Sequence, residues 1–327
     1  MEKIGKILRS SIHIFLQNYH YFTSTAALLA FPFSVSVLLS QALVPASPPP
    51  LPTIYNRLRT LFDAAGFPSS SQFFTILSQK LSETIFSHIF TLPFTLTFLL
   101  IAKACIIQSL NHTKPTSPHS FTSIISIYKP ILLTFLCNSF LILSANTTFF
   151  CLIFFVFNFF DGFGFSSSNF LLFLSAAGAV LYSIIVANTF VICNLALILS
   201  GMEGCGGYIS ILKACVLIRG RTSMALFLAL PVNLALAAIE ALFHFRVMRA
   251  FIFAEKPASS IIIEGIFIAY LYSIFIVLDT IVNYMFFKSC KAASSINQEG
   301  ENFYRIEFSE KGNCNYYVSI QNFEELP

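Results

Sequence analysis

The sequence predicts an all-α integral membrane protein: a bundle of about six transmembrane helices with amphipathic helices at the membrane interface. Three observations point to this fold class. Hydrophobic residues make up 56% of the 327 residues, charged residues make up only 10%, and the mean hydropathy is +0.77. A soluble globular domain carries about 25% charged residues. The excess apolar surface of this chain is therefore expected to face lipid.

Six apolar stretches are long enough to cross a bilayer, which takes about 20 helical residues. The third and fourth stretches exceed that length and should tilt or protrude. The predicted spans are Phe22–Val44, Thr84–Ile107, Ile131–Phe157, Phe170–Ser200, Thr222–Phe243 and Ile261–Phe287. Pro32, Pro93 and Pro231 fall inside the first, second and fifth spans, and each predicts a kink.

The chain divides into an N-terminal cytosolic amphipathic segment (residues 1–21), a six-helix transmembrane domain (22–291) and a polar cytosolic tail (292–327). With the N-terminus in the cytosol, thirteen Lys and Arg residues fall on the cytosolic side and six on the other. The positive-inside rule thus favours cytosolic N- and C-termini. The sequon at Asn111 should then stay unglycosylated. The choice between endoplasmic reticulum and plasma membrane stays open.

Several segments outside the spans are expected at the membrane surface. Ile4, Ile7 and Leu8 recur at helical spacing, which indicates an interfacial helix before the first span. After a proline-rich linker, Ile54–Ala65 and Gln72–Ser82 are predicted as two short segments on the outer surface. The tail forms either a short hairpin or a disordered chain.

Ionisable side chains within spans are costly and often functional. Lys103 and Asp279 fall at similar depth in the cytosolic half, where we expect them to pair or to share a water-filled pocket. The alternative is that Lys103 reaches the interface and Asp279 bonds a neighbouring helix. Four amides at the same depth complete a candidate polar layer: Asn138, Asn188, Asn194 and Asn283. The layer serves either helix–helix hydrogen bonding or a substrate or ion path.

Other polar residues give weaker signals. Glu240 and Glu264 flank an outer loop and are read as hydrated interface residues, and His88 as a packed histidine. Cys290 lies beside the last span and is a candidate for palmitoylation, with an unmodified thiol as the alternative. The glycine-rich stretch Gly201–Gly207 lacks the residue order of a P-loop. The sequence shows no catalytic, cofactor-binding, metal-binding or nucleic-acid-binding pattern.

The stretch from Val191 to Leu230 carries a recognisable pattern: an apolar span, a turn with Glu203 and Gly207, an amphipathic segment over Ile209–Arg221, and the next span. This pattern resembles a plant family of six-span transmembrane proteins of unknown function. More distantly, it is similar to the membrane domain associated with bacterial glycerophosphodiester phosphodiesterases. The resemblance implies a six-span fold and no activity, since the catalytic barrel of those enzymes is absent. The high Phe content and the proline-rich linker depart from the family pattern.

Together these features favour a non-enzymatic multi-pass protein that organises a membrane or assists other components there. Its expected partners are the lipid bilayer and other membrane proteins, with no nucleic acid. The alternative is a small transporter or channel that uses the polar layer around Lys103 and Asp279.

Overall fold

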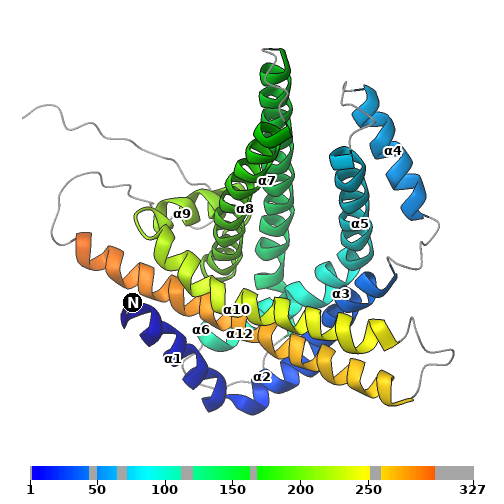
Figure 1. Ribbon diagram of the computed structural model, residues 1–327. Coiled ribbons are helices and arrows are strands. Elements are labelled where there is room, and N and C mark those ends of the chain that lie inside the picture. The colour runs from blue at the N-terminus through cyan, green and yellow to red at the C-terminus, as the bar shows by residue number, and fades with distance from the viewer. Residues whose placement is uncertain are drawn as a thin grey trace, which may run out of the picture.

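The chain is almost entirely helical in the parts that the structure describes. The computed structural model describes residues 2–43, 50–64, 72–111, 121–162, 168–250 and 259–298. Its helices (Figure 1) are α1 (Glu2–Gln17), α2 (Tyr19–Thr25), α3 (Phe31–Leu43), α4 (Pro50–Ala64), α5 (Gln72–Phe94), α6 (Leu100–Asn111), α7 (Phe121–Gly162), α8 (Ser168–Glu203), α9 (Tyr208–Ile218), α10 (Thr222–Phe243) and α12 (Ser259–Gln298). Three π-helical turns adjoin them: Ala26–Ala30, Thr95–Leu99 and His244–Met248.

Six helical segments in the described ranges are long and apolar enough to cross a membrane, which confirms the predicted fold class. They are Tyr19–Leu43, Ser78–Asn111, Ile124–Leu152, Ala176–Glu203, Thr222–Met248 and Ser260–Ala292. Helices α7 and α8 have 42 and 36 residues. At 1.5 Å per residue, both are much longer than a hydrocarbon core of about 30 Å. The predicted excess length of the third and fourth spans is therefore confirmed.

Two of the three span prolines lie next to a π-helical turn. Pro32 follows the turn Ala26–Ala30, and Pro93 precedes the turn Thr95–Leu99. A proline lacks the N–H that continues the helical ladder, and π-helical turns are a recognised place for a helix to bend. The hydroxyl of Thr97 donates to the carbonyl of Pro93 at 2.7 Å. At Pro231, helix α10 continues without such a turn.

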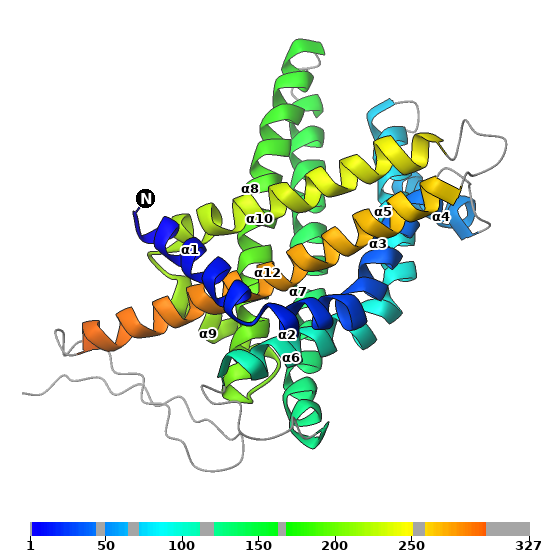
Figure 2. The same cartoon turned by 90° about the horizontal axis from the view of Figure 1, so that it is seen from below.

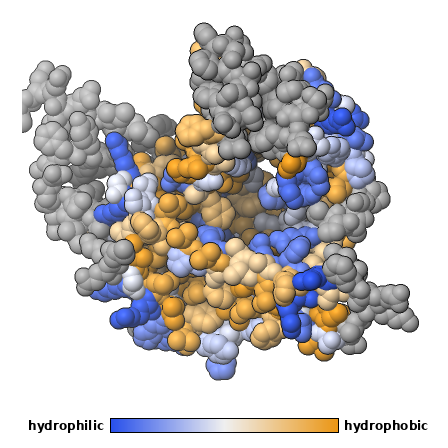
Figure 3. All heavy atoms as spheres, viewed as in Figure 1, coloured by the Kyte–Doolittle hydropathy of each residue, from blue (hydrophilic) through white to orange (hydrophobic). Residues whose placement is uncertain are grey.

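Helix α12 lies at the centre of the arrangement. It contacts α1, α2, α3, α6, α8, α9 and α10, and α7 packs along α8 as a long hairpin (Figures 1 and 2). One core cluster lies toward α9 and includes Ile7, Ile198 and Phe286, and another lies toward α3 and includes Phe22 and Val277. Figure 3 shows apolar residues across the visible face, with hydrophilic residues gathered toward its edges.

Both predicted amphipathic helices form. Helix α1 buries Ile7 in the core and packs on α12 and α10. Helix α9 buries Ile211 and Ala214, whereas Leu212 and Val216 on the opposite side are 51% and 58% exposed. The apolar residues of this helix are therefore divided between two faces, one packed on the bundle and one exposed.

The span boundaries shift by several residues from the predicted ones, and two segments outside the predicted spans also differ. Gln72–Ser82 is not a separate surface segment but the first part of α5, because no proline interrupts the helix before Pro93. Helix α12 continues through Gln298, so the first residues of the predicted tail are helical. The predicted hairpin in the tail lies outside the described residues.

Candidate functional site

The polar layer gathers where three transmembrane helices meet. Lys103 lies on α6, Asn194 on α8 and Asp279 on α12, and these three helices contact one another. The Lys103 side chain is 8% exposed, and its Nζ donates a long hydrogen bond to Asn194 Oδ1 at 3.5 Å. The ammonium group of Lys103 therefore lies inside the bundle, which favours the polar layer over the alternative in which Lys103 reaches the interface.

Asp279 balances the charge of Lys103 without touching it. The two groups interact electrostatically but do not form a direct ion pair. Asp279 Oδ1 instead accepts a hydrogen bond from Asn283 Nδ2 at 3.0 Å, one turn along the same helix. Opposite charges in a low-dielectric interior attract over several ångströms. The predicted charge pair thus exists as a nearby counter-charge and not as a contact.

Asparagine side chains, one in the polar layer and one outside it, form hydrogen bonds between α7 and α8. Asn138 is 3% exposed, and its Nδ2 donates to the carbonyl of Cys193 at 3.0 Å. Further along the hairpin, the hydroxyl of Tyr182 donates to Asn146 Oδ1 at 3.0 Å. The buried Oδ1 of Asn138 has no hydrogen-bond partner among the described residues. Asn188 is half-buried on α8, between these two contacts.

A second group of polar side chains surrounds Glu240 on α10. The sequence did not predict this group. Its Oε2 accepts a hydrogen bond from Gln41 Nε2 at 3.1 Å, and its Oε1 accepts one from the Tyr272 hydroxyl at 2.8 Å. These bonds tie α10 to α3 and α12. Glu264, in contrast, forms an exposed ion pair with Arg246 at 3.2 Å, consistent with a hydrated interface residue.

Replacing Tyr272 by Phe should lower the free energy of unfolding by about 1–2 kcal/mol, because a half-buried carboxylate loses a donor. Equilibrium unfolding in mixed detergent–SDS micelles measures this change. Tyr208→Phe is the matched control: that residue is 67% exposed on α9, and its loss of a hydroxyl should leave stability within about 0.5 kcal/mol. Equal losses in the two variants would contradict the role given to Tyr272.

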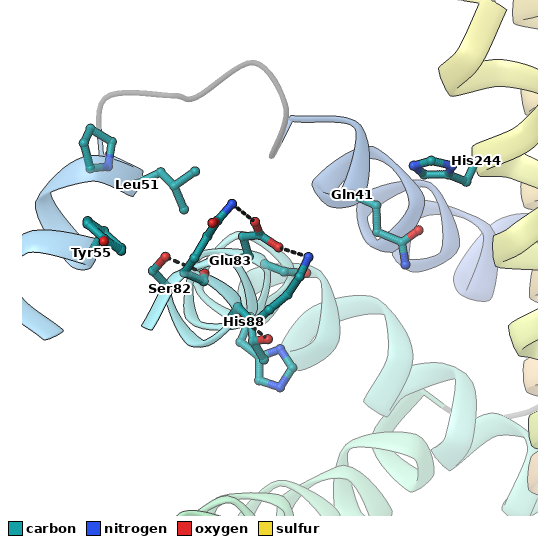
Figure 4. A pocket seen from close by; sticks show the side chains of 12 residues that line it. Gln41, Leu51, Tyr55, Ser82, Glu83, His88 and His244 are labelled. Atoms are coloured by element: carbon teal, nitrogen blue, oxygen red, sulfur yellow. Dashed lines mark hydrogen bonds and ion pairs between the residues drawn. The ribbon is translucent and has the colours of Figure 1, made fainter. Parts of the chain in front are cut away.

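A polar pocket lies between α3, α4, α5 and the end of α10 (Figure 4). Its volume is about 850 Å³. His88 and His244 both line this pocket. His88 is exposed there, so the prediction of a packed histidine is wrong. Lys80 Nζ pairs with Glu83 Oε2 at 2.8 Å on one wall, which neutralises two of its charges locally. The pocket does not include residues of the polar layer.

The glycine-rich turn after α8 packs closely against helix α7. An added Cβ at Gly206 would lie 2.6 Å from the carbonyl oxygen of Pro130 and 2.7 Å from its Cα. The next residue, Gly207, has a φ of 82° and donates its N–H to Thr134 Oγ1 at 2.8 Å. The turn therefore sits directly on the backbone of α7. Only glycine allows this approach.

The chain matches one described family over most of its length. The family is described as a domain of unknown function (DUF8558), and it matches residues 3–303. The chain belongs to the DUF8558 family. No curated protein and no solved structure matches it. The polar layer, the Glu240 group and the glycine-rich turn all lie inside the region that the DUF8558 match covers.

Cys290 is a poor target for acylation in this arrangement. Its side chain is 1% exposed and belongs to the core cluster that includes Phe286 and Phe287. A palmitoyl chain would have to displace those neighbours, so the burial of Cys290 weighs against the predicted modification.

A second cysteine, Cys215 on α9, is also unreactive in this arrangement. Burial raises the pKa of its thiol above the usual value, so the thiol is protonated at neutral pH.

Proposed function

We propose that this DUF8558 protein is a non-enzymatic multi-pass membrane protein that organises a membrane or assists other components in it. The observation that supports this proposal best is the use of the intramembrane polar groups. Lys103 bonds α8, Asn138 bonds α8, and Glu240 bonds both α3 and α12. These groups fasten helix to helix, as expected of a scaffold.

The α7–α8 hairpin supplies the surface for such a role. Leu143 on α7 and Val180 on α8 are 62% and 61% exposed. Apolar surface of this kind is covered by lipid or by helices of another membrane protein. A photoreactive amino acid at Leu143 should give discrete protein adducts in native membranes. Lipid adducts alone would contradict an accessory role through this hairpin.

A small transporter or channel is the second candidate. Lys103 and Asp279 are opposite charges within the bundle that stop short of contact, and ionisable groups inside membranes often mark substrate paths. The unpartnered Oδ1 of Asn138 lies on a helix that packs against α6 and α8. Under this reading, a cation or proton would pass between these groups.

One experiment separates the two candidates. The purified protein is reconstituted in vesicles that contain a pH-sensitive dye, and proton, sodium and potassium gradients are imposed in turn. The scaffold proposal expects no flux above protein-free vesicles, while Asp279→Asn lowers stability. Flux by the wild-type protein that Asp279→Asn abolishes would establish transport instead. Stability of the variant is measured on the same preparation.

We also propose that both termini face the cytosol, which the unequal numbers of Lys and Arg on the two sides support. The likeness of Val191–Leu230 to plant six-span proteins, and to the membrane domain found beside bacterial phosphodiesterases, fits a role close to lipid. Neither resemblance implies an enzymatic activity.

A further inference from the structure

Four basic residues lie on segments that meet at one end of the bundle, where α9 and α10 both contact α12. Arg219 and Arg221 flank Gly220 in the turn between α9 and α10, and Lys288 and Lys291 flank Cys290 on α12. Arg221 Nη1 donates to the carbonyl of Cys290 at 3.2 Å, which joins the two segments. Gly220 has a φ of 77°, so the tight turn needs glycine there.

These cations lie at the boundary of the apolar spans. The fifth span begins at Thr222, directly after Arg221, and the sixth ends at Ala292, directly after Lys291. Helices α10 and α12 pack against each other along the bundle, so these two boundaries lie on the same side. The side chains of Lys6 and Arg9 are exposed on α1, which contacts both α10 and α12.

The nearby acid Glu203 does not pair with Arg219 or Lys288. Glu203, at the end of α8, is already paired with Lys213 of α9 at 2.7 Å. Arg219 and Lys288 are exposed, and neither side chain has a hydrogen-bond or ion-pair partner among the described residues. Two cationic groups are therefore free to bind an anion beside Arg221.

Helix α9 adds an apolar strip that leads to these cations. Tyr208, Leu212 and Val216 are spaced four residues apart, lie on one face, and are 67%, 51% and 58% exposed. Arg219 follows at the end of the same helix. A surface with an exposed apolar strip at one end and free cations at the other matches an acyl chain joined to a phosphate.

We infer that this corner of the bundle binds the headgroup of an anionic phospholipid, with Arg219 and Lys288 contacting the phosphate and α9 supporting an acyl chain. The inference adds a lipid class to the proposed function and holds equally if the protein is a transporter. Arg221 is a positioning residue here, because its guanidinium holds the turn against α12.

The test is a lipid titration of the full chain in detergent, followed by native mass spectrometry. Phosphatidylglycerol, phosphatidylcholine and inorganic phosphate are added separately. The test variant is Arg219→Gln with Lys288→Gln, and the control is Arg57→Gln with Arg59→Gln, two exposed arginines on α4. Each basic group near an anionic headgroup contributes about fivefold in affinity, so the test variant should bind phosphatidylglycerol about 25-fold more weakly.

We expect the wild type and the control variant to prefer phosphatidylglycerol to phosphatidylcholine, and the test variant to lose that preference with an unchanged unfolding temperature. An unchanged preference in the test variant would overturn the inference, as would an equal loss in the control. Binding of inorganic phosphate with the same affinity as phosphatidylglycerol would also overturn it, since the site would then not recognise lipid.

Discussion

Gly206→Ala should destabilise the protein strongly. The new methyl group would overlap the carbonyl oxygen, Cα and carbonyl carbon of Pro130, at 2.6, 2.7 and 3.0 Å. These are backbone atoms of α7 and cannot rotate away as a side chain could. Either α7 or the turn after α8 must move. Overpacking of this kind costs about 1–3 kcal/mol, and we expect the upper part of that range.

The measurement is the free energy of unfolding in mixed detergent–SDS micelles. Gly5→Ala provides the control, because Gly5 lies in α1 and an added Cβ there meets nothing within 4 Å. That change should stabilise the helix by about 0.5–1 kcal/mol. The same chemical substitution is thus expected to act with opposite sign at two sites. A loss below about 1 kcal/mol for Gly206→Ala would contradict the close packing of this turn on α7.

Asp279→Leu should be about as damaging, and a second change should reverse it. The variant leaves the buried ammonium of Lys103 without its counter-charge, and breaking a buried charge pair on one side costs about 3–5 kcal/mol. The Lys103–Asp279 interaction is not a contact, so we expect about 3 kcal/mol. Adding Lys103→Met removes the unbalanced charge. The double variant should therefore regain stability to within about 1 kcal/mol of the wild type.

An exposed ion pair supplies the matched comparison. Arg246 and Glu264 are 56% and 45% exposed, and exposed pairs couple by less than about 1 kcal/mol. The corresponding cycle with Glu264→Leu and Arg246→Met should show that small coupling. If Lys103→Met failed to rescue Asp279→Leu, the two charges would be acting independently. Lys103 would then depend on Asn194 alone.

The spans could be predicted from the sequence because an apolar run of about twenty residues that enters a bilayer must satisfy its backbone hydrogen bonds as a helix. It also placed Lys103 and Asp279 at a shared depth, since rise per residue follows directly from helix geometry. It did not find the partner of Lys103. Contact depends on how each helix is rotated about its axis, and that rotation is decided by packing against helices distant in the sequence. Asn194 accordingly became the nearest partner.

Glu240 and Gly206 show the same limit. The position of Glu240 near a predicted loop predicts an interface residue but not its two partners, which come from α3 and α12. The glycines after α8 indicated a turn, but their contact with Pro130 joins residues far apart in the chain. A glycine cluster next to a span end was the available signal for close packing. The sequence did not show that the backbone of α7 at Pro130 is the surface on which these glycines pack.

Mapping of N-glycosylation tests the six-span account most directly. One native sequon, at Asn111, follows the second span, and another, at Asn146, lies inside the third span. Leu58→Thr creates a sequon at Asn56 on α4, after the first span. Acceptor tags are fused to both termini of the same chain. We predict a glycan at Asn56 and none at Asn111 or at either terminus. A glycan at one terminus but not the other would require an odd number of crossings and would contradict the account.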